Sequence, residues 1–120
     1  MTWRSRISAL ALLPLLAVAA CRSPHVEVTV ENQTGAEVRL LEVDYPNASF
    51  GVDSLAPGGI YRYRIQVIGQ GSVKVQYTDP GNHQPQMTGP TLQEGDRGLL
   101  DIVLMPGGKA EWHPQIVQSH

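Results

Sequence analysis

The stretch His25-Val26-Glu27-Val28-Thr29-Val30-Glu31 decides the fold of this chain. Its valines alternate strictly with polar side chains. Because successive side chains of a β-strand point to opposite faces of a sheet, this alternation predicts a strand with one buried face and one solvent face. The segment 60–68 repeats the pattern, with Tyr, Ile and Val on one face and Arg62 and Arg64 on the other. Aromatic and β-branched residues suit such a half-buried surface.

Further short segments of this kind follow, separated by turns rich in Gly, Pro and Asn. They are residues 37–45, 49–54, 72–79, 84–92, 99–105 and 109–112. We expect a short edge strand at 49–54. We expect an edge strand or a loop at 84–92, because Pro85 and Pro90 cannot donate to a sheet. The apolar segment 99–105 indicates a central strand.

Two local features refine this prediction. Gly69-Gln70-Gly71 predicts a tight hairpin between segments 60–68 and 72–79. At Leu40-Leu41 the apolar positions change parity, which predicts either a β-bulge or a strand buried on both faces.

No window has helical spacing, so the chain is predicted to be all-β. Seven or eight short strands at regular spacing favour an antiparallel sandwich, either immunoglobulin-like or transthyretin-like. A small β-barrel is the alternative. The sandwich domain is placed at residues 25–112, and residues 113–120 are expected to form a flexible tail.

Composition excludes several classes of protein. The chain has 120 residues and a formal net charge of −2, which argues against a nucleic-acid-binding protein, because such a protein should carry a basic stripe. Hydrophobic residues make up 42% and charged residues 17%, which argues against disorder. A single cysteine excludes an internal disulfide framework and a cysteine-rich zinc site.

The first twenty residues have the pattern of a cleaved signal peptide. Arg4 and Arg6 are followed by fourteen uncharged residues, 7–20, which are rich in Leu and Ala. A membrane-spanning helix needs about 20 apolar residues, and Pro14 interrupts this run. An uncleaved hydrophobic anchor is the alternative.

The sequence Val18-Ala19-Ala20-Cys21 resembles the lipobox of bacterial lipoproteins, and Cys21 is the only cysteine in the chain. The resemblance implies that Cys21 receives a diacylglyceryl group and that signal peptidase II cuts between Ala20 and Cys21. It also implies N-acylation of the new amino terminus. Several acyl chains suffice for stable membrane anchoring. An ordinary secreted protein is the alternative.

The residues after the cysteine complete this prediction. Residues 21–24 would form the lipidated cysteine and a short spacer. In enterobacterial lipoproteins an Asp after the cysteine retains the protein in the inner membrane, so Arg22 favours the outer membrane, facing the periplasm. Removing Arg4 and Arg6 with the leader leaves a formal charge of −4.

Arg62, Arg64 and Trp112 are the candidate partner surface. The two arginines, with Arg39 beside them, have two interpretations. They either bind an acidic group or form cross-strand ion pairs on a solvated face. The acidic residues considered for such pairs are Glu37, Glu42 and Asp44. Trp112 either contributes to an interface or caps one end of the core.

The main hypothesis is a non-enzymatic envelope lipoprotein that acts as a binding or structural module. A partner protein would bind at an exposed edge strand or at the Trp112 corner, with no cofactor beyond the lipid on Cys21. One alternative is a small-ligand or copper-binding lipoprotein that uses His83, Met87 and His113. A less favoured alternative is an envelope-glycan enzyme that uses Glu42 and Asp44.

Overall fold

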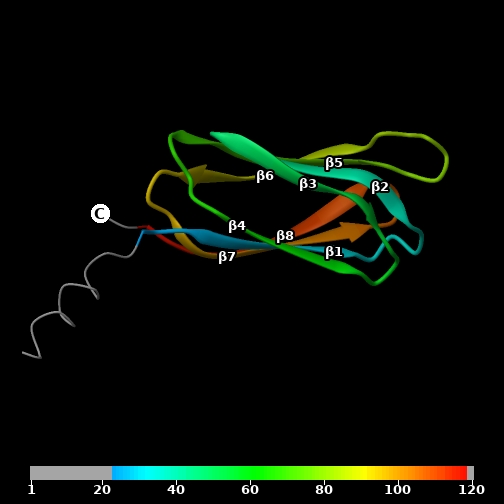
Figure 1. Ribbon diagram of the computed structural model, residues 1–120, viewed down its shortest axis with the longest axis horizontal. Helices are drawn as coiled ribbons and strands as arrows, with labels where there is room; N and C mark the ends of the chain where they lie inside the picture. The colour runs from blue at the N-terminus through cyan, green and yellow to red at the C-terminus, as the bar shows by residue number, and fades with distance from the viewer. Residues whose placement is uncertain (1–22, 119–120) are drawn as a thin grey trace, which may run out of the picture.

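The structure, a computed structural model, describes residues 23–118. Within that range the chain forms eight strands (Figure 1): β1 (Val26–Asn32), β2 (Val38–Tyr45), β3 (Ala48–Leu55), β4 (Ile60–Ile65), β5 (Gln70–Thr78), β6 (Gln86–Gln93), β7 (Arg97–Met105) and β8 (Lys109–Val117). The predicted leader and the lipidation site Cys21 lie outside the described residues.

The strands form two four-stranded sheets, in the orders β4-β1-β7-β8 and β3-β2-β5-β6, which pack face to face as a sandwich (Figure 1). Both sheets are open, so the barrel alternative is wrong. In an immunoglobulin sandwich the first, second, fourth and fifth strands share one sheet. Here β1 and β4 lie in one sheet and β2 and β5 in the other. Of the two predicted arrangements, this leaves the transthyretin-like one.

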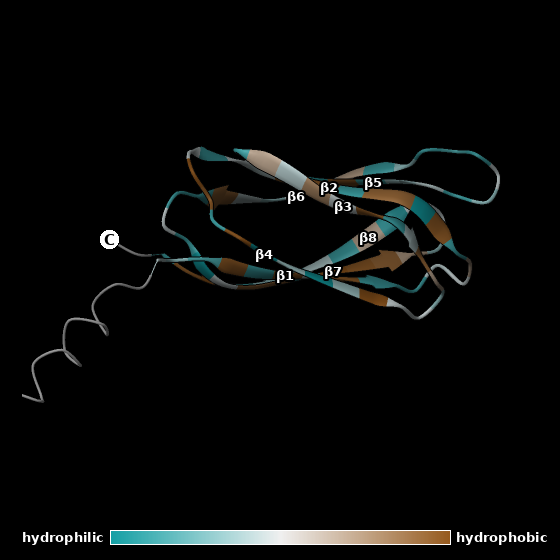
Figure 2. Ribbon diagram, in the orientation of Figure 1, coloured by the Kyte–Doolittle hydropathy of each residue, from teal (hydrophilic) through white to brown (hydrophobic). Residues whose placement is uncertain are grey.

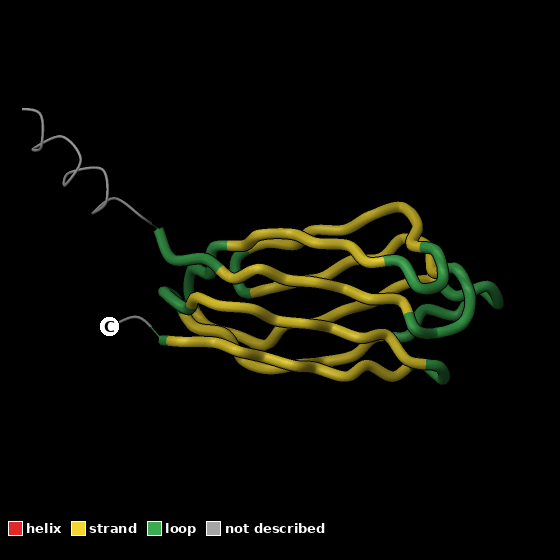
Figure 3. Tube along the Cα trace, turned by 90° about the horizontal axis from the view of Figure 1, so that it is seen from below, coloured by secondary structure: helices red, strands yellow, loops and turns green. Residues whose placement is uncertain are grey.

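One strand pair corrects the expectation of a purely antiparallel fold. β1 and β7 are parallel, from Val26 opposite Gly98 to Asn32 opposite Leu104. Both strands start at the end of the sandwich where the described chain begins and ends (Figure 3), which we call the terminal end. The opposite end carries the turns 33–37, 56–59, 79–85 and 106–108, and we call it the distal end.

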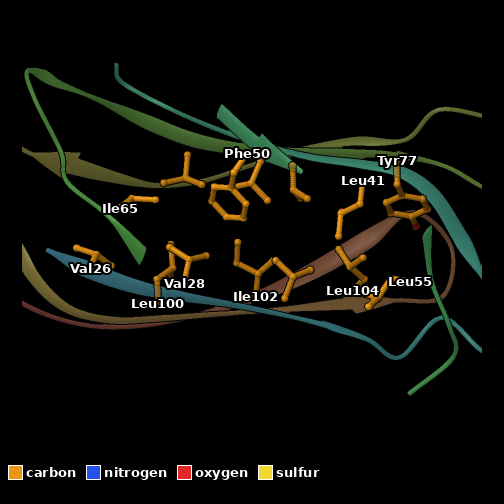
Figure 4. Close-up of a cluster of buried hydrophobic side chains, with 14 of the residues drawn as sticks. Val26, Val28, Leu41, Phe50, Leu55, Ile65, Tyr77, Leu100, Ile102 and Leu104 are labelled. Carbon is orange, nitrogen blue, oxygen red and sulfur yellow. The ribbon is translucent and has the colours of Figure 1, made fainter. Parts of the chain in front are cut away.

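The core lies between the two sheets and follows the predicted alternation (Figures 2 and 4). Val26, Val28 and Val30 of β1 are fully buried. Leu100, Ile102 and Leu104 of β7 are equally buried, as expected for a central strand. The core residues contributed by the first sheet are Val26, Val28, Val30, Ile65, Leu100, Ile102 and Leu104. Those contributed by the second sheet are Val38, Leu41, Val43, Phe50, Leu55, Val73, Val75, Tyr77 and Leu92.

The hairpin predicted at Gly69-Gln70-Gly71 is wrong. β4 pairs with β1, whereas β5 pairs with β2 and β6, so residues 66–69 cross from one sheet to the other. Asn47 holds this crossing: its Oδ1 accepts from the Ile68 N–H at 3.0 Å, and its Nδ2 donates to the Gln66 carbonyl at 3.2 Å. The sheets are therefore joined here by a side chain that the sequence marked only as part of a turn.

The parity change at Leu40-Leu41 is a β-bulge, as predicted. The pairing of β2 with β5 shifts register between Arg39 and Glu42. Leu40 has a φ of 51°, in the left-handed region, and its side chain is 61% exposed. The extra residue lets Leu41 and Val43 continue into the core.

The predicted flexible tail is wrong in its extent. β8 continues through Val117, five residues beyond the expected end at Trp112. Pro114 lies in this strand, opposite Leu100 of β7. Because β8 is an edge strand, a residue without an N–H can be accommodated there.

Candidate functional site

The candidate arginines lie on the solvent face of the first sheet, as predicted, but their expected partners are wrong. Glu42 and Asp44 belong to β2, in the other sheet. Arg64 instead places its Nε 3.7 Å from Oε2 of Glu27, its cross-strand neighbour on β1. The pair is largely exposed, so it contributes less than about 1 kcal/mol.

Arg39 is likewise separated from the other two arginines. Its Nη2 donates a hydrogen bond of 2.9 Å to Oδ1 of Asn82 in the β5–β6 loop. Arg39 therefore connects β2 to the β5–β6 loop at the distal end. It does not share the solvent face of the first sheet with Arg62 and Arg64.

Arg62 lines an open depression of about 310 Å³ on the solvent face of the first sheet. Thr29, Asp101 and His113 line the same depression, because the strand register places these four residues in one row across β4, β1, β7 and β8. The row offers donors and acceptors of both charge signs to a partner.

Trp112 lies between the sheets and serves as a cap. It packs against the core and lies opposite Ile102 of β7. A Cβ placed on Gly89 of β6 would lie 2.3 Å from the Trp112 ring, so the indole covers the glycine backbone directly. Trp112 therefore closes the side of the sandwich between β6 and β8, and it does not share a surface with Arg62 and Arg64.

The three copper candidates lie in different surroundings. His83 is in the distal β5–β6 loop, where its Nδ1 lies 3.4 Å from Oδ1 of Asp79. Met87 packs against the core between the sheets. His113 is on the solvent face of the first sheet, with Nε2 3.4 Å from Oε1 of Glu111. No group of three or more His, Cys, Asp or Glu residues arranged for a metal occurs within residues 23–118.

The glycan-hydrolysis candidates lie side by side along β2. Glu42 is flanked by Gly51 and Gln76, and Asp44 has Ser49 and Lys74 as its cross-strand neighbours. Neither carboxylate lines the depressions of about 910, 310 and 230 Å³ on the described surface.

The four free strand edges differ in their protection. Natural edges are blunted by proline, by lysine or other charged residues, or by short strand length. β6 contains Pro90, β8 contains Lys109 and Pro114, and β4 has only six residues, two of them arginine. β3 has eight residues with no proline, lysine or arginine, and Asp53 is its one charged residue. The prediction of edge strands at 49–54 and 84–92 is confirmed.

An aromatic cluster that the sequence analysis missed lies beside the β3 edge. Phe50 of β3 stacks on Tyr63 of β4, with ring centroids 4.6 Å apart. Tyr61 and Tyr45 lie 6.1 and 6.3 Å from Phe50. Burial raises the pKa of Tyr45, and the nearby Tyr63 raises it further. The signal in the sequence was the shared parity of Tyr61 and Tyr63, but it could not show that they face β3.

The terminal end carries a depression of about 910 Å³. It lies where the chain enters the sandwich and is lined by Ser23, Pro24, His25, Glu27, Arg64, Arg97, Gly98, Leu99 and Val117. The entering segment is held in place: the Gly98 N–H donates to the His25 carbonyl at 3.2 Å. Within residues 23–118 there is no helix capable of crossing a bilayer.

Comparisons with known proteins define the class of fold. No family model matches the chain, and no curated protein matches it. A protein from Eubacterium rectale, solved by NMR, has a similar structure, with a TM-score of 0.55 over 80% of this chain and 91% of that chain. The two sequences are 14% identical, so the likeness concerns the all-β sandwich fold alone.

Proposed function

We propose that this chain is a non-catalytic lipoprotein of the bacterial cell envelope that is anchored through Cys21 and binds an extended segment of a partner protein along the free edge of β3. The anchor is supported by the lipobox-like residues 18–21, which precede β1 by only a few residues. Arg22 favours the outer membrane, with the sandwich in the periplasm.

The observation that carries the binding function is the contrast between β3 and the other three edges. An extended peptide can add to an open sheet edge by main-chain hydrogen bonds, while its side chains occupy alternate faces. Along β3, Phe50 is buried and Ser49, Gly51 and Asp53 are exposed, so an added strand would find one apolar side and one polar side. No proline, lysine or arginine of β3 obstructs it.

Photo-crosslinking in the native envelope tests this proposal. A photoreactive amino acid replaces Asp53 on β3 in one variant and Thr88 on β6 in the control. Both positions are exposed and both lie on edge strands, but β6 also carries Pro90. We expect a specific protein adduct from position 53 and none from position 88. Equal adducts from both positions, or none from position 53, would contradict strand capture.

The crosslinked peptide then identifies the partner segment. Strand addition requires the N–H groups of alternate residues in that segment, so a proline at a position whose N–H faces β3 should abolish the adduct. An alanine at the same position should preserve it. If both substitutions act alike, the contact is made by side chains, and strand addition is wrong.

A further inference from the structure

We propose that the terminal end of the sandwich rests on the phospholipid headgroups of the membrane, with Ile68, Leu99 and Val117 in contact with the interfacial layer. This inference rests on the proposed lipidation of Cys21. It adds a second, non-covalent membrane contact and an orientation for the domain.

The first argument is the reach of the chain. Cys21 and Ser23 are two residues apart, so their Cα atoms are separated by at most about 7 Å. The headgroup layer of one leaflet is itself roughly 5–7 Å thick. With acyl chains of Cys21 in the hydrocarbon, Ser23 stays at the membrane surface. The terminal end is then the part of the domain closest to the lipid.

The second argument is what this end presents. Six large apolar side chains are conspicuously exposed in the described chain. Three belong to the terminal end: Ile68 is 55% exposed, Leu99 46% and Val117 63%. They come from the crossing after β4, from the start of β7 and from the end of β8. Exposed apolar side chains near one end of the domain suit contact with the interfacial layer of a bilayer.

The third argument is the charge around these side chains. The depression of about 910 Å³ has Leu99 and Val117 in its wall together with Arg64, Arg97 and Glu27. Guanidinium groups bind phosphate, and a carboxylate can accept from an ammonium group. Arg64 and Glu27 form an exposed ion pair with each other at 3.7 Å, so the depression presents charge of both signs, as a zwitterionic headgroup does.

The fourth argument is that the end is preorganised. Asn47 fixes the backbone of Gln66 and Ile68, and Oε1 of Glu94 accepts from the Gly69 N–H at 3.0 Å. The loops between β2 and β3, β4 and β5, and β6 and β7 are therefore tied together. Ile68 is presented on a braced loop, so little conformational entropy is lost on contact.

The orientation has a consequence for the β3 edge. The strands run between the two ends of the sandwich (Figure 3). A domain that rests on its terminal end holds β3 at an angle to the bilayer, with Ala48 near the surface and Leu55 away from it. The edge then remains open to the periplasm along its length.

Single-cysteine labelling of the lipidated full-length protein tests the inference. Because lipidation consumes the Cys21 thiol, Val117→Cys or Ile68→Cys provides one free thiol at the terminal end. Gln84→Cys in the exposed distal loop is the matched control. Each variant receives a polarity-sensitive NBD label and is reconstituted into phosphatidylethanolamine–phosphatidylglycerol vesicles, with and without doxyl-labelled lipid.

We expect labels at 117 and 68 to shift to shorter emission wavelength and to be quenched by doxyl lipid, and the label at 84 to behave as in water. Aqueous spectra at all three positions would overturn the inference. A blue shift without doxyl quenching would mean that a second protein copy covers the patch, and would overturn it too. Labelling of the wild-type protein at Cys21 would instead show that the anchor is wrong, and the inference would fall with it.

Discussion

Phe50 and Tyr63 stack across the two sheets, with ring centroids 4.6 Å apart and planes inclined by 20°. Phe50 is buried, and Tyr63 covers it from β4 while keeping 44% of its own surface exposed. This contact ties the unprotected β3 edge to the opposite sheet. It holds β3, an edge strand of the second sheet, in place against β4.

Removing the ring of Tyr63 should therefore destabilise the sandwich. We expect Tyr63→Ala to lower the free energy of unfolding by about 1–2 kcal/mol, from the lost stacking and the lost apolar burial. Tyr63→Phe keeps the ring and should change stability by less than about 0.5 kcal/mol. Thermal unfolding followed by circular dichroism measures both. Equal melting temperatures for the two variants would show that the stacking is not stabilising.

Gly51 is required by the close approach of β2. A Cβ at this position would lie 2.3 Å from the carbonyl oxygen of Leu41, the residue that follows the bulge. We expect Gly51→Ala to cost roughly 1–3 kcal/mol, because the backbone of β2 must move.

Gly71 is the control for Gly51, since a Cβ there meets its nearest atom, in Pro46, at an ordinary 3.5 Å. Gly71→Ala should be neutral or stabilising by about 0.4–1 kcal/mol, through the reduced entropy of the unfolded chain. Urea unfolding of the two variants gives the comparison. A Gly51→Ala variant as stable as Gly71→Ala would contradict the close contact.

The fully buried Asn32 holds the distal end through its amide. Its Nδ2 donates to the carbonyls of Ala36 at 2.8 Å and Leu55 at 2.9 Å, and its Oδ1 accepts from the Thr34 N–H at 3.0 Å. Asn32→Asp keeps the shape and turns the donor into an acceptor that faces two carbonyls. We expect a loss of about 3 kcal/mol or more at pH 7.

The loss caused by Asn32→Asp should diminish at low pH. Burial against carbonyls should raise the pKa of the new carboxyl in the folded state, so the penalty is full when the group is ionised and smaller when it is protonated. The difference in free energy of unfolding between Asn32→Asp and wild type should therefore be smaller at pH 4 than at pH 7. The same difference in free energy of unfolding at both pH values would mean that the new carboxylate reaches solvent.

Tyr77 should make the fold sensitive to alkali. Burial raises its pKa above the ordinary value near 10, and the charge of Asp79 raises it further. The folded state therefore favours the neutral phenol. The contribution of Tyr77 to the free energy of unfolding is complete below pH 10 and is lost as the pH rises through the raised pKa. The melting temperature of Tyr77→Phe should decline less than that of wild type above pH 10. Parallel declines would contradict this assignment.

Periodicity predicted the strands well because burial of one face imposes it directly. The Val26–Val28–Val30 alternation and the parity change at Leu40-Leu41 needed only local reasoning, and both predictions are confirmed. Pro85 and Pro90 indicated an edge strand or a loop, because proline cannot donate a hydrogen bond to a neighbouring strand. The segment is the edge strand β6.

Strand pairing was less predictable, because it depends on contacts between distant residues. Gly69-Gln70-Gly71 has the composition of a hairpin turn, yet Asn47 braces the adjoining segment as a crossing between sheets. The arginine partners were wrong because they too depend on strand pairing: Glu27 lies opposite Arg64 since β4 pairs with β1. The sequence left two interpretations of Trp112 open, a core cap or part of an interface, because nothing local to it shows its contact with Gly89.

The central claim is the lipid anchor, and the intact mass of the protein purified from bacterial membranes tests it most directly. We predict that the mature chain begins at Cys21 and is heavier than residues 21–120 by a diacylglyceryl group and an amide-linked acyl chain. We also predict that Cys21→Ala gains no lipid. A wild-type chain of unmodified mass, or a Cys21→Ala variant that is retained in the membrane equally, would contradict the account.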